Sequence, residues 1–451
     1  MKLFEPPSHV HFRSALTFRT RMSYLRRLNS SSLVRNIALV TSGAAAGQVI
    51  AFAFSPLITR IYSPEVFGVQ GVFLSLLSIL SPVIALRYPM AIVIAKDEDD
   101  AHRLGRLSLL IALAISSLLV LVLAVAQPSV SALLRVEALG KLIWFLPLAL
   151  FCVALADVLA YRTSRLELFR LVAKVTAAQA FLTNLARVLV GVYVPVAASL
   201  VAVTSLAPSV QAFLLMRGTQ NREYTAPPLH RSDTVALLKE HRDFPLFRMP
   251  TDVLNSASQS VPVILLAALF SPAVAGLYTL TRSVLNLPSN IIGAAIRAPL
   301  YARFAELARN GNALTPLLLR ASASLLALVP VIVSLAWFAP SVFAFVFGEE
   351  WREAGSYARW MSLWLAVGIA NVPVTNVLPV IGGQSLLLVF NILLLAVRLF
   401  SILGVYWLSG SALMAVAWFS VISAIALILA NIVFTGYTIR FDRARRPVVD
   451  G

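Results

Sequence analysis

The chain has 451 residues, of which 59% are hydrophobic and 13% are charged, and its formal net charge is +17. An ordinary soluble domain is roughly 45–50% apolar, and one membrane-spanning helix needs about 20 mostly apolar residues. The composition therefore argues against a soluble enzyme or a secreted domain and predicts about a dozen membrane spans. The single cysteine, Cys152, allows neither an intramolecular disulfide nor a cysteine-based metal site.

Twelve apolar runs are long enough to be transmembrane helices. In chain order they cover residues 36–57, 66–87, 107–127, 142–161, 171–192, 194–216, 245–269, 273–297, 313–339, 357–380, 386–405 and 411–435. The fold class predicted is therefore an all-α polytopic membrane protein with about 12 transmembrane helices.

Basic residues collect in alternate connections between these runs. With the N-terminus inside, 28 Lys and Arg residues lie on the inner side, five on the outer side and four within spans. Because positively charged loops stay in the cytoplasm, both termini are predicted to be cytoplasmic. The excess of basic residues is therefore explained by the orientation of the chain in the membrane. We expect no nucleic acid partner.

The span-bearing region divides at a polar connection, residues 217–244, which contains Pro227-Pro228. This predicts an N-lobe at 36–216 and a C-lobe at 245–436, flanked by cytoplasmic segments at 1–35 and 437–451.

A weak internal repeat supports the two lobes. The hexapeptide Ser63-Pro64-Glu65-Val66-Phe67-Gly68 is echoed 208 positions later by Ser271-Pro272-Ala273-Val274-Ala275-Gly276. The spans that follow the two copies end in Arg87-Tyr88-Pro89 and Arg297-Ala298-Pro299. Recurrence of Pro and Gly in short hairpins is the alternative explanation. A parallel repeat of six-span halves is an arrangement of carrier folds.

Motifs for nucleotide, dinucleotide and metal binding are missing from the sequence. It contains neither a Gly-x-x-x-x-Gly-Lys-Ser/Thr loop nor a Gly-x-Gly-x-x-Gly turn. All five histidines fall in segments predicted to be cytoplasmic, which leaves none for a metal site or proton relay within the membrane. We therefore expect no cofactor, no metal and no enzymatic activity.

Charged residues inside the spans are the strongest functional signal, because each costs at least ~2.5–3.5 kcal/mol in hydrocarbon. At about 1.5 Å per residue, Arg282 lies ~14 Å from the outer end of its span and Arg398 lies ~18 Å from the inner end of its own. Guanidinium forks suit phosphate and carboxylate oxygens, so a cavity lined by arginines favours an anion. Alternatively, these arginines pair with backbone carbonyls at helix kinks, or their side chains extend (snorkel) to the membrane–water interface.

Lys174 and Asp157 lie near the inner ends of adjoining spans and are predicted to form a structural ion pair. The candidate substrate-binding residues are Arg282, Arg398, Arg187, Arg87, Arg297 and Asp252; Asp252 would neutralise one of the arginines or none.

Several stretches resemble one family, the polysaccharide biosynthesis proteins that act as O-antigen and exopolysaccharide flippases. The resemblance is carried by residues 36–106, including Ser55-Pro56-Leu57-Ile58-Thr59-Arg60 and Leu86-Arg87-Tyr88-Pro89-Met90, by Phe244-Pro245-Leu246, by Arg282-Ser283-Val284-Leu285-Asn286-Leu287-Pro288, and by Phe347-Gly348-Glu349-Glu350-Trp351-Arg352. The family belongs to the multidrug, oligosaccharidyl-lipid and polysaccharide exporter (MOP) superfamily. Its fold, similar to that of the drug and toxin extruders (MATE), implies two six-helix lobes around a central cavity.

The resemblance implies a substrate made of an oligosaccharide on a polyprenyl diphosphate, flipped across a bacterial inner membrane by alternating access. Membrane lipids and a polysaccharide polymerase machinery are the other partners it implies. Asp252 is an acidic residue in a stretch that is expected to be uncharged in the family. With Asp252 present, the cavity would not be purely cationic. A multidrug or small-solute antiporter on the same fold and a membrane polysaccharide polymerase or ligase are the competing functions.

Overall fold

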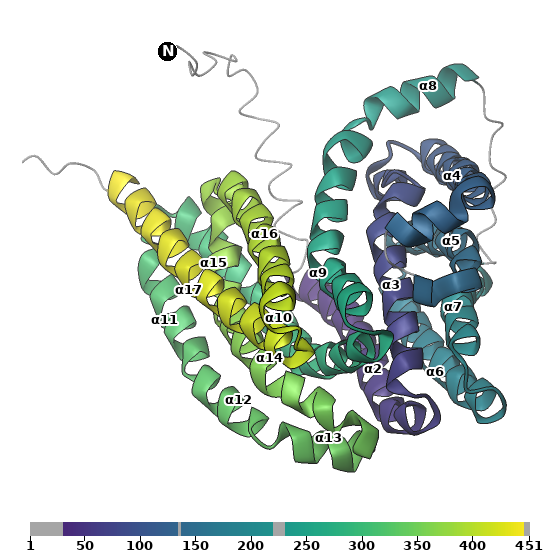
Figure 1. Cartoon of the computed structure of the whole chain (residues 1–451). Helices are drawn as coiled ribbons and strands as arrows, with labels where there is room; N and C mark the ends of the chain where they lie inside the picture. The colour runs from purple at the N-terminus through teal and green to yellow at the C-terminus, as the bar shows by residue number, and fades with distance from the viewer. Residues whose placement is uncertain (1–29, 134–136, 220–230, 446–451) are drawn as a thin grey trace, which may run out of the picture.

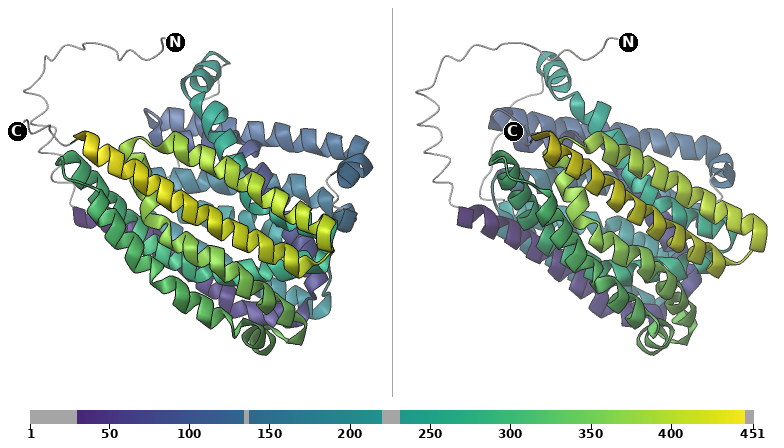
Figure 2. Two further views of the ribbon diagram at one scale, coloured as in Figure 1. Left: turned by 60° about the vertical axis from the view of Figure 1, so that its left-hand side comes forward. Right: turned by 90° about the vertical axis from the view of Figure 1, so that its left-hand side faces the viewer.

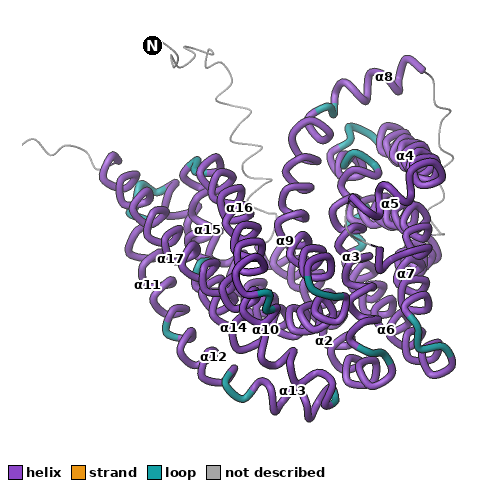
Figure 3. The backbone as a smooth tube through the Cα atoms, viewed as in Figure 1, coloured by secondary structure: helices purple, strands orange, loops and turns teal. Residues whose placement is uncertain are grey.

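The computed structural model describes residues 30–133, 137–219 and 231–445, and all secondary structure in these ranges is helical (Figure 3). Parts of the predicted cytoplasmic segments and of the connection 217–244 lie outside them. The long helices are α2 Ser30–Ile61, α3 Pro64–Ile84, α4 Glu98–Leu133, α5 Phe145–Arg165, α6 Phe169–Tyr193, α7 Ala197–Thr219, α9 Met249–Leu269, α10 Pro272–Arg309, α11 Thr315–Leu326, α14 Arg352–Ala370, α16 Gln384–Ser409 and α17 Ala412–Arg445. Shorter ones are η1 Tyr88–Ile94, η2 Glu137–Trp144, α8 Arg231–Glu240, η4 Phe244–Arg248, α12 Leu328–Ala336, α13 Ala339–Phe347, η5 Glu349–Trp351, α15 Val372–Val377 and η6 Leu378–Ile381.

The helices form two groups that lie side by side (Figure 1). Helices α2 to α7 pack on one another, α10 to α17 form the second group, and α3 contacts both α9 and α10. Helix α2 begins and α17 ends at the same end of the bundle, toward the left in Figure 2. We call this the terminal end, and we call the end with the α2–α3 and α9–α10 turns the far end. The lobe limits 36–216 and 245–436 stay a prediction.

Eleven helices in the described ranges are long and apolar enough to cross a membrane. They correspond to eleven of the twelve predicted spans, and a break at Ala327 divides one of them into α11 and α12. The remaining span belongs to α10, which has 38 residues but is more polar than the others because it carries Arg282, Asn286 and Asn290. The all-helical membrane fold predicted from composition is thus confirmed.

The repeated hexapeptides meet each other where α3 and α10 cross. A Cβ atom built on Gly68 would lie 1.7 Å from the carbonyl oxygen of Pro272, and one on Gly276 would lie 1.9 Å from that of Pro64. Farther along, a Cβ on Gly71 would lie 2.6 Å from the Oγ1 atom of Thr279. Only glycine allows helix backbones to approach so closely. The echo in the sequence therefore marks a close helix crossing.

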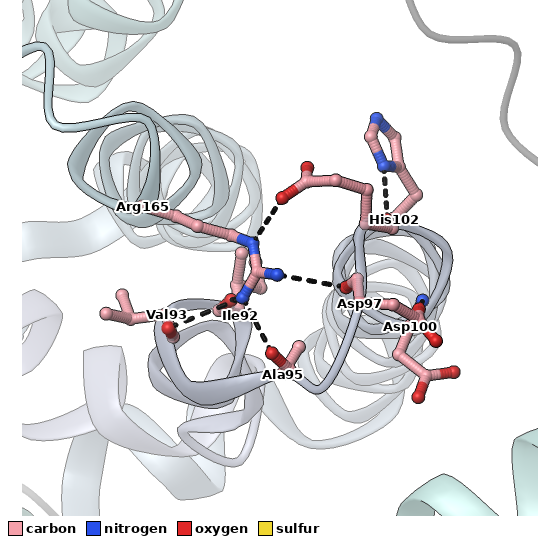
Figure 4. A network of polar contacts seen from close by, with 8 residues as sticks. Ile92, Val93, Ala95, Asp97, Asp100, His102 and Arg165 are labelled. Carbon is pink, nitrogen blue, oxygen red and sulfur yellow. Dashed lines mark hydrogen bonds and ion pairs between the residues drawn. The ribbon is translucent and has the colours of Figure 1, made fainter. Parts of the chain in front are cut away.

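A strained corner connects α3 to η1. Leu86 and Arg87 have φ values of 50° and 60°, a left-handed conformation that costs roughly 1–2 kcal/mol for a residue with a Cβ. The other end of η1 is held by Arg165, whose guanidinium donates to the carbonyl oxygens of Ile92 and Ala95 at 3.0 and 2.9 Å (Figure 4). The same group forms an ion pair of 2.7 Å with Glu98, at the start of α4. These contacts fix η1 between α4 and α5.

Two buried polar side chains fix helix ends elsewhere. The indole Nε1 of Trp351, in the stretch that carries the third part of the resemblance, donates to the carbonyl oxygen of Thr59 at 3.0 Å. The carboxylate of Asp442 on α17 accepts from the backbone N–H groups of Leu314 and Thr315 at 2.9 and 2.8 Å. A carboxylate at a helix N-terminus satisfies otherwise unpaired donors, so Asp442 stabilises the start of α11.

Candidate functional site

A cavity of about 230 Å³ lies among α9, α10, α14, α16 and α17. Amide, aromatic and basic side chains make up most of its lining, which consists of Asn255, Ser258, Gln259, Pro262, Tyr278, Arg282, Asn286, Trp364, Asn391, Leu394, Arg398 and Phe419. We call it the arginine cavity. It brings together Arg282 and Arg398, which are 116 positions apart in the chain.

Arg282 is held from one side by Gln259 of α9. Its guanidinium donates to the backbone carbonyl of Gln259 at 2.5 Å and to the side-chain Oε1 at 2.9 Å. The carbonyl bond matches the alternative in which an arginine within a span satisfies a backbone group, here three residues before Pro262 of α9. A guanidinium has five N–H donors, so these two bonds leave others for a ligand.

Arg398 is more enclosed, with 8% of its surface exposed. Its Nε donates to the hydroxyl of Ser423 at 3.2 Å, and its Cζ lies 5.0 Å from the ring centre of Trp364 and 5.4 Å from that of Phe419. Cation–π contacts of this kind contribute about 0.5–2 kcal/mol each. The aromatic rings thus hold a guanidinium in the membrane interior.

No carboxylate is among the residues that line the arginine cavity, and within the described ranges neither Arg282 nor Arg398 forms an ion pair. The Nε1–H of Trp364 also has no hydrogen-bond partner there. Two positive charges in a low-dielectric site attract an anion strongly, and the Trp364 donor adds to this polarity. The charges of the lining are thus chemically suited to an anionic group.

Two other candidate residues, Arg87 and Asp252, bind each other instead. Arg87 Nε lies 2.8 Å from the carboxylate of Asp252 and its NH1 lies 4.0 Å from that of Asp157. Asp252 also pairs with Arg248 at 3.2 Å. The predicted Lys174–Asp157 pair is not formed: Lys174 is exposed, and the left-handed turn at Arg87 brings this arginine to Asp157 instead.

The last two candidates lie away from the arginine cavity. Arg187 is packed between α6 and α7, where it donates to the side chains of Asn184 and Thr204 at 3.3 Å each. Arg297 is exposed on α10, and its backbone carbonyl accepts from the amide of Asn376 at 3.1 Å. At about 1.5 Å per residue, it is ~22 Å from Arg282 toward the terminal end.

Helix α8 is tied to the α2–α7 group outside the membrane spans. Lys96 Nζ lies 2.9 Å from the carboxylate of Glu240, and this hydrogen bond and charge lower the pKa of Glu240 and raise the pKa of Lys96. The hydroxyl of Tyr88 donates to the carbonyl oxygen of Leu238 at 3.3 Å, and burial raises the pKa of this phenol.

The polar uncharged residues of the cavity are not among the candidates predicted from the sequence. Gln259 positions Arg282, and Asn255, Asn286 and Asn391 add amide groups to the lining. They could be found by the criterion that identified the charged residues, which is a polar side chain within an apolar span. Such a side chain also costs free energy unless it has a hydrogen-bond partner.

Solved structures with the same fold include MATE transporters. An inward-facing multidrug resistance MATE transporter of the MOP superfamily is 14% identical and matches with a TM-score of 0.66, covering 91% of this chain and 96% of that chain. An outward-facing one, 15% identical, has a TM-score of 0.56 over 92% and 96%. A MOP transporter from Pyrococcus furiosus, whose reversed pocket polarity is reported to suggest a different function, is 14% identical with a TM-score of 0.55 over 91% and 96%.

The chain thus has the fold of these transporters, and eleven helices in its described ranges are long and apolar enough to cross a membrane. A model of the polysaccharide biosynthesis protein family matches residues 57–356, well over half of the chain, and the chain belongs to that family. No curated protein matches the sequence. The resemblance noted in the sequence is thereby confirmed.

Proposed function

We propose that this transporter flips an oligosaccharide linked to a polyprenyl diphosphate across the bacterial inner membrane, with both termini in the cytoplasm. The observation that carries the proposal is the arginine cavity, where Arg282 and Arg398 face one space that no carboxylate lines within the described ranges. Membership of the polysaccharide biosynthesis family supports a glycan-bearing substrate, and a diphosphate is the part of the proposed substrate that two guanidinium groups would recognise.

Arg282 is the residue we expect to contact the diphosphate. It is less buried than Arg398, it lines the cavity, and its position on Gln259 orients the guanidinium without neutralising it. Loss of one charge-assisted hydrogen bond removes roughly 1.5–3 kcal/mol, which is one to two decades in affinity.

The alternative function, a small-solute or multidrug antiporter, needs carboxylates facing the cavity to bind a cation. Asp157 and Asp252, the acidic residues within the predicted spans, lie outside the lining of the arginine cavity and beside Arg87. This distribution of charge supports an anionic substrate.

Complementation of a gene deletion tests the proposal. The deletion should make lipid-linked glycan accumulate on the cytoplasmic leaflet and remove the corresponding polymer from the cell surface. Wild type should restore the polymer, Arg282→Lys should restore part of it, and Arg282→Ala and Arg282→Glu should restore little at normal protein abundance. Arg320→Ala, at an exposed arginine of α11, is the matched control and should behave as wild type. Full export by the Glu variant would refute the anion contact.

A further inference from the structure

A second cavity, of about 260 Å³, lies between α2 and α10. It is lined by uncharged residues, namely Gln48, Ala51, Phe52, Ser55, Leu280, Ser283, Val284, Asn286, Leu287 and Asn290. We propose that this α2–α10 cavity binds the sugar residues that adjoin the diphosphate of the substrate, a proposal that rests on the function proposed above.

The chemistry of the lining matches a sugar. Hydroxyl groups of a sugar both donate and accept hydrogen bonds, and side-chain amides such as Gln48, Asn286 and Asn290 offer both functions. The ring of Phe52 is 38% exposed, and its edge-on contact with Phe347 at 6.4 Å keeps it in place. An aromatic face beside amides provides an apolar surface for the C–H groups of a sugar ring.

One atom of this lining lacks a hydrogen-bond partner in the described part of the chain. The Oε1 oxygen of Gln48 is buried and accepts no hydrogen bond there. An unpaired buried acceptor destabilises the protein without ligand, and a ligand that donates to it removes this cost. Gln48 is therefore suited to accept a bond from a sugar hydroxyl.

The position of the cavity matches the covalent structure of the substrate. Asn286 lines both this cavity and the arginine cavity, and it follows Arg282 by four residues on α10. One helical turn separates the two by ~6 Å along the helix axis. Because the first sugar is bonded directly to the diphosphate, a diphosphate at Arg282 places that sugar at Asn286. Each cavity is somewhat smaller than the ~300–1,000 Å³ typical of drug-sized ligands, so each accepts a small part of the substrate.

Binding of two probes to the purified full-length protein in lipid nanodiscs tests the assignment. One probe is undecaprenyl diphosphate, and the other is the lipid-linked glycan extracted from cells of the source organism in which this gene is deleted. Gln48→Leu is expected to weaken glycan-lipid binding roughly three- to tenfold, the loss of one hydrogen bond, and to leave undecaprenyl diphosphate binding unchanged. Asn290→Leu should do the same. Gln179→Leu, at a half-buried glutamine of α6 that lines neither cavity, is the matched control.

The two proposals fail in different ways. Arg282→Ala should weaken binding of both probes by one to two decades; if it changes neither, the proposed diphosphate contact is wrong. If Gln48→Leu and Asn290→Leu, each folded as judged by thermal unfolding, leave glycan-lipid binding unchanged or weaken both probes equally, the sugar site is wrong.

Discussion

Arg87 and Asp252 form an ion pair of 2.8 Å that joins the corner before η1 to the first turn of α9. The pair connects a residue of the α2–α7 group to a helix whose other half positions Arg282 through Gln259. Helix α9 is thus attached at its start to one group and, near its middle, to Arg282 of the other.

Breaking this pair should destabilise the protein. Asp252→Asn keeps the shape of the side chain but removes the partner of a guanidinium that is only 21% exposed. We expect the free energy of unfolding to fall by about 1.5–3 kcal/mol, because Asp252 loses both its ion pair with Arg87 and the charge-assisted hydrogen bond it accepts from Arg248. Unfolding in mixed detergent micelles measures it. Glu306→Gln, which breaks the exposed Arg303–Glu306 pair, should change it by less than about 1 kcal/mol; equal losses for the two variants would contradict the interpretation.

Alanine at the glycine crossing should open the far end. The added methyl group of Gly68→Ala would clash with the backbone of Pro272, so α3 and α10 must separate. Spin labels at Val196→Cys and Ser409→Cys, in a Cys152→Ala background, should report a longer distance across the far end. Gly404→Ala, where no atom lies within 4 Å of the added Cβ, is the control and should leave the distance distribution unchanged. Identical distributions for both alanine variants would show that the crossing does not hold this end closed.

Replacing Arg398 should reduce export without lowering the temperature at which the protein unfolds. Its charge is buried and lacks an ion-pair partner in the described ranges, and apolar residues that replace buried charged groups are often neutral or stabilising. Arg398→Met, which keeps most of the volume, is therefore expected to unfold at a temperature no lower than wild type while surface polymer is strongly reduced. A less stable variant with normal export per molecule would indicate that Arg398 serves packing alone.

The ion pair between Lys96 and Glu240, which holds α8 in place, should depend on pH. The pKa of Glu240 is lowered in the folded protein, so the contribution of its pair with Lys96 is present above the unfolded pKa of about 4.3 and is lost as pH falls through the folded value. At high pH the contribution is lost as Lys96, whose pKa is raised, loses its proton. Hydrogen exchange of α8, corrected for the intrinsic pH dependence, should therefore increase in acid. Lys96→Ala should remove this dependence, and a dependence that persists would assign it to another group.

Reporter fusions test the predicted orientation. Alkaline phosphatase fused after Trp351, at the far end, should be active because that end is predicted to face away from the cytoplasm. Fusions after Thr219 and after Arg445, at the terminal end, should be inactive. Activity at Thr219 would overturn the orientation.

The sequence was most informative about features that repeat or that cost free energy in lipid. Hydropathy located the helices because each must satisfy its backbone internally. The hexapeptide echo pointed to Gly68 and Gly276, although nothing in it showed that the two copies touch. The polar residues of α10 include Arg282 and Asn286, which line the arginine cavity.

Pairwise contacts between distant residues could not be predicted in the same way. Arg282 and Arg398 were both placed near the midplane, but depth alone does not show that two residues face one cavity. Asp157 was assigned to Lys174 because their spans are neighbours in the chain, whereas the left-handed backbone at Arg87 decides the pairing. Such a conformation in a residue with a Cβ follows from tertiary contacts and has no sequence signature.

The glycine crossing has the form of an interface between two identical subunits. Gly68 contacts Pro272, the first residue of α10, and Gly276 contacts Pro64, the first residue of α3. Each copy of the hexapeptide therefore contacts the other through the same two positions. Such reciprocity is the hallmark of an isologous contact in a twofold symmetric dimer. A six-helix ancestor carrying one hexapeptide would already possess a self-complementary surface, and duplication followed by fusion would convert its dimer axis into the pseudo-symmetry axis of a single chain.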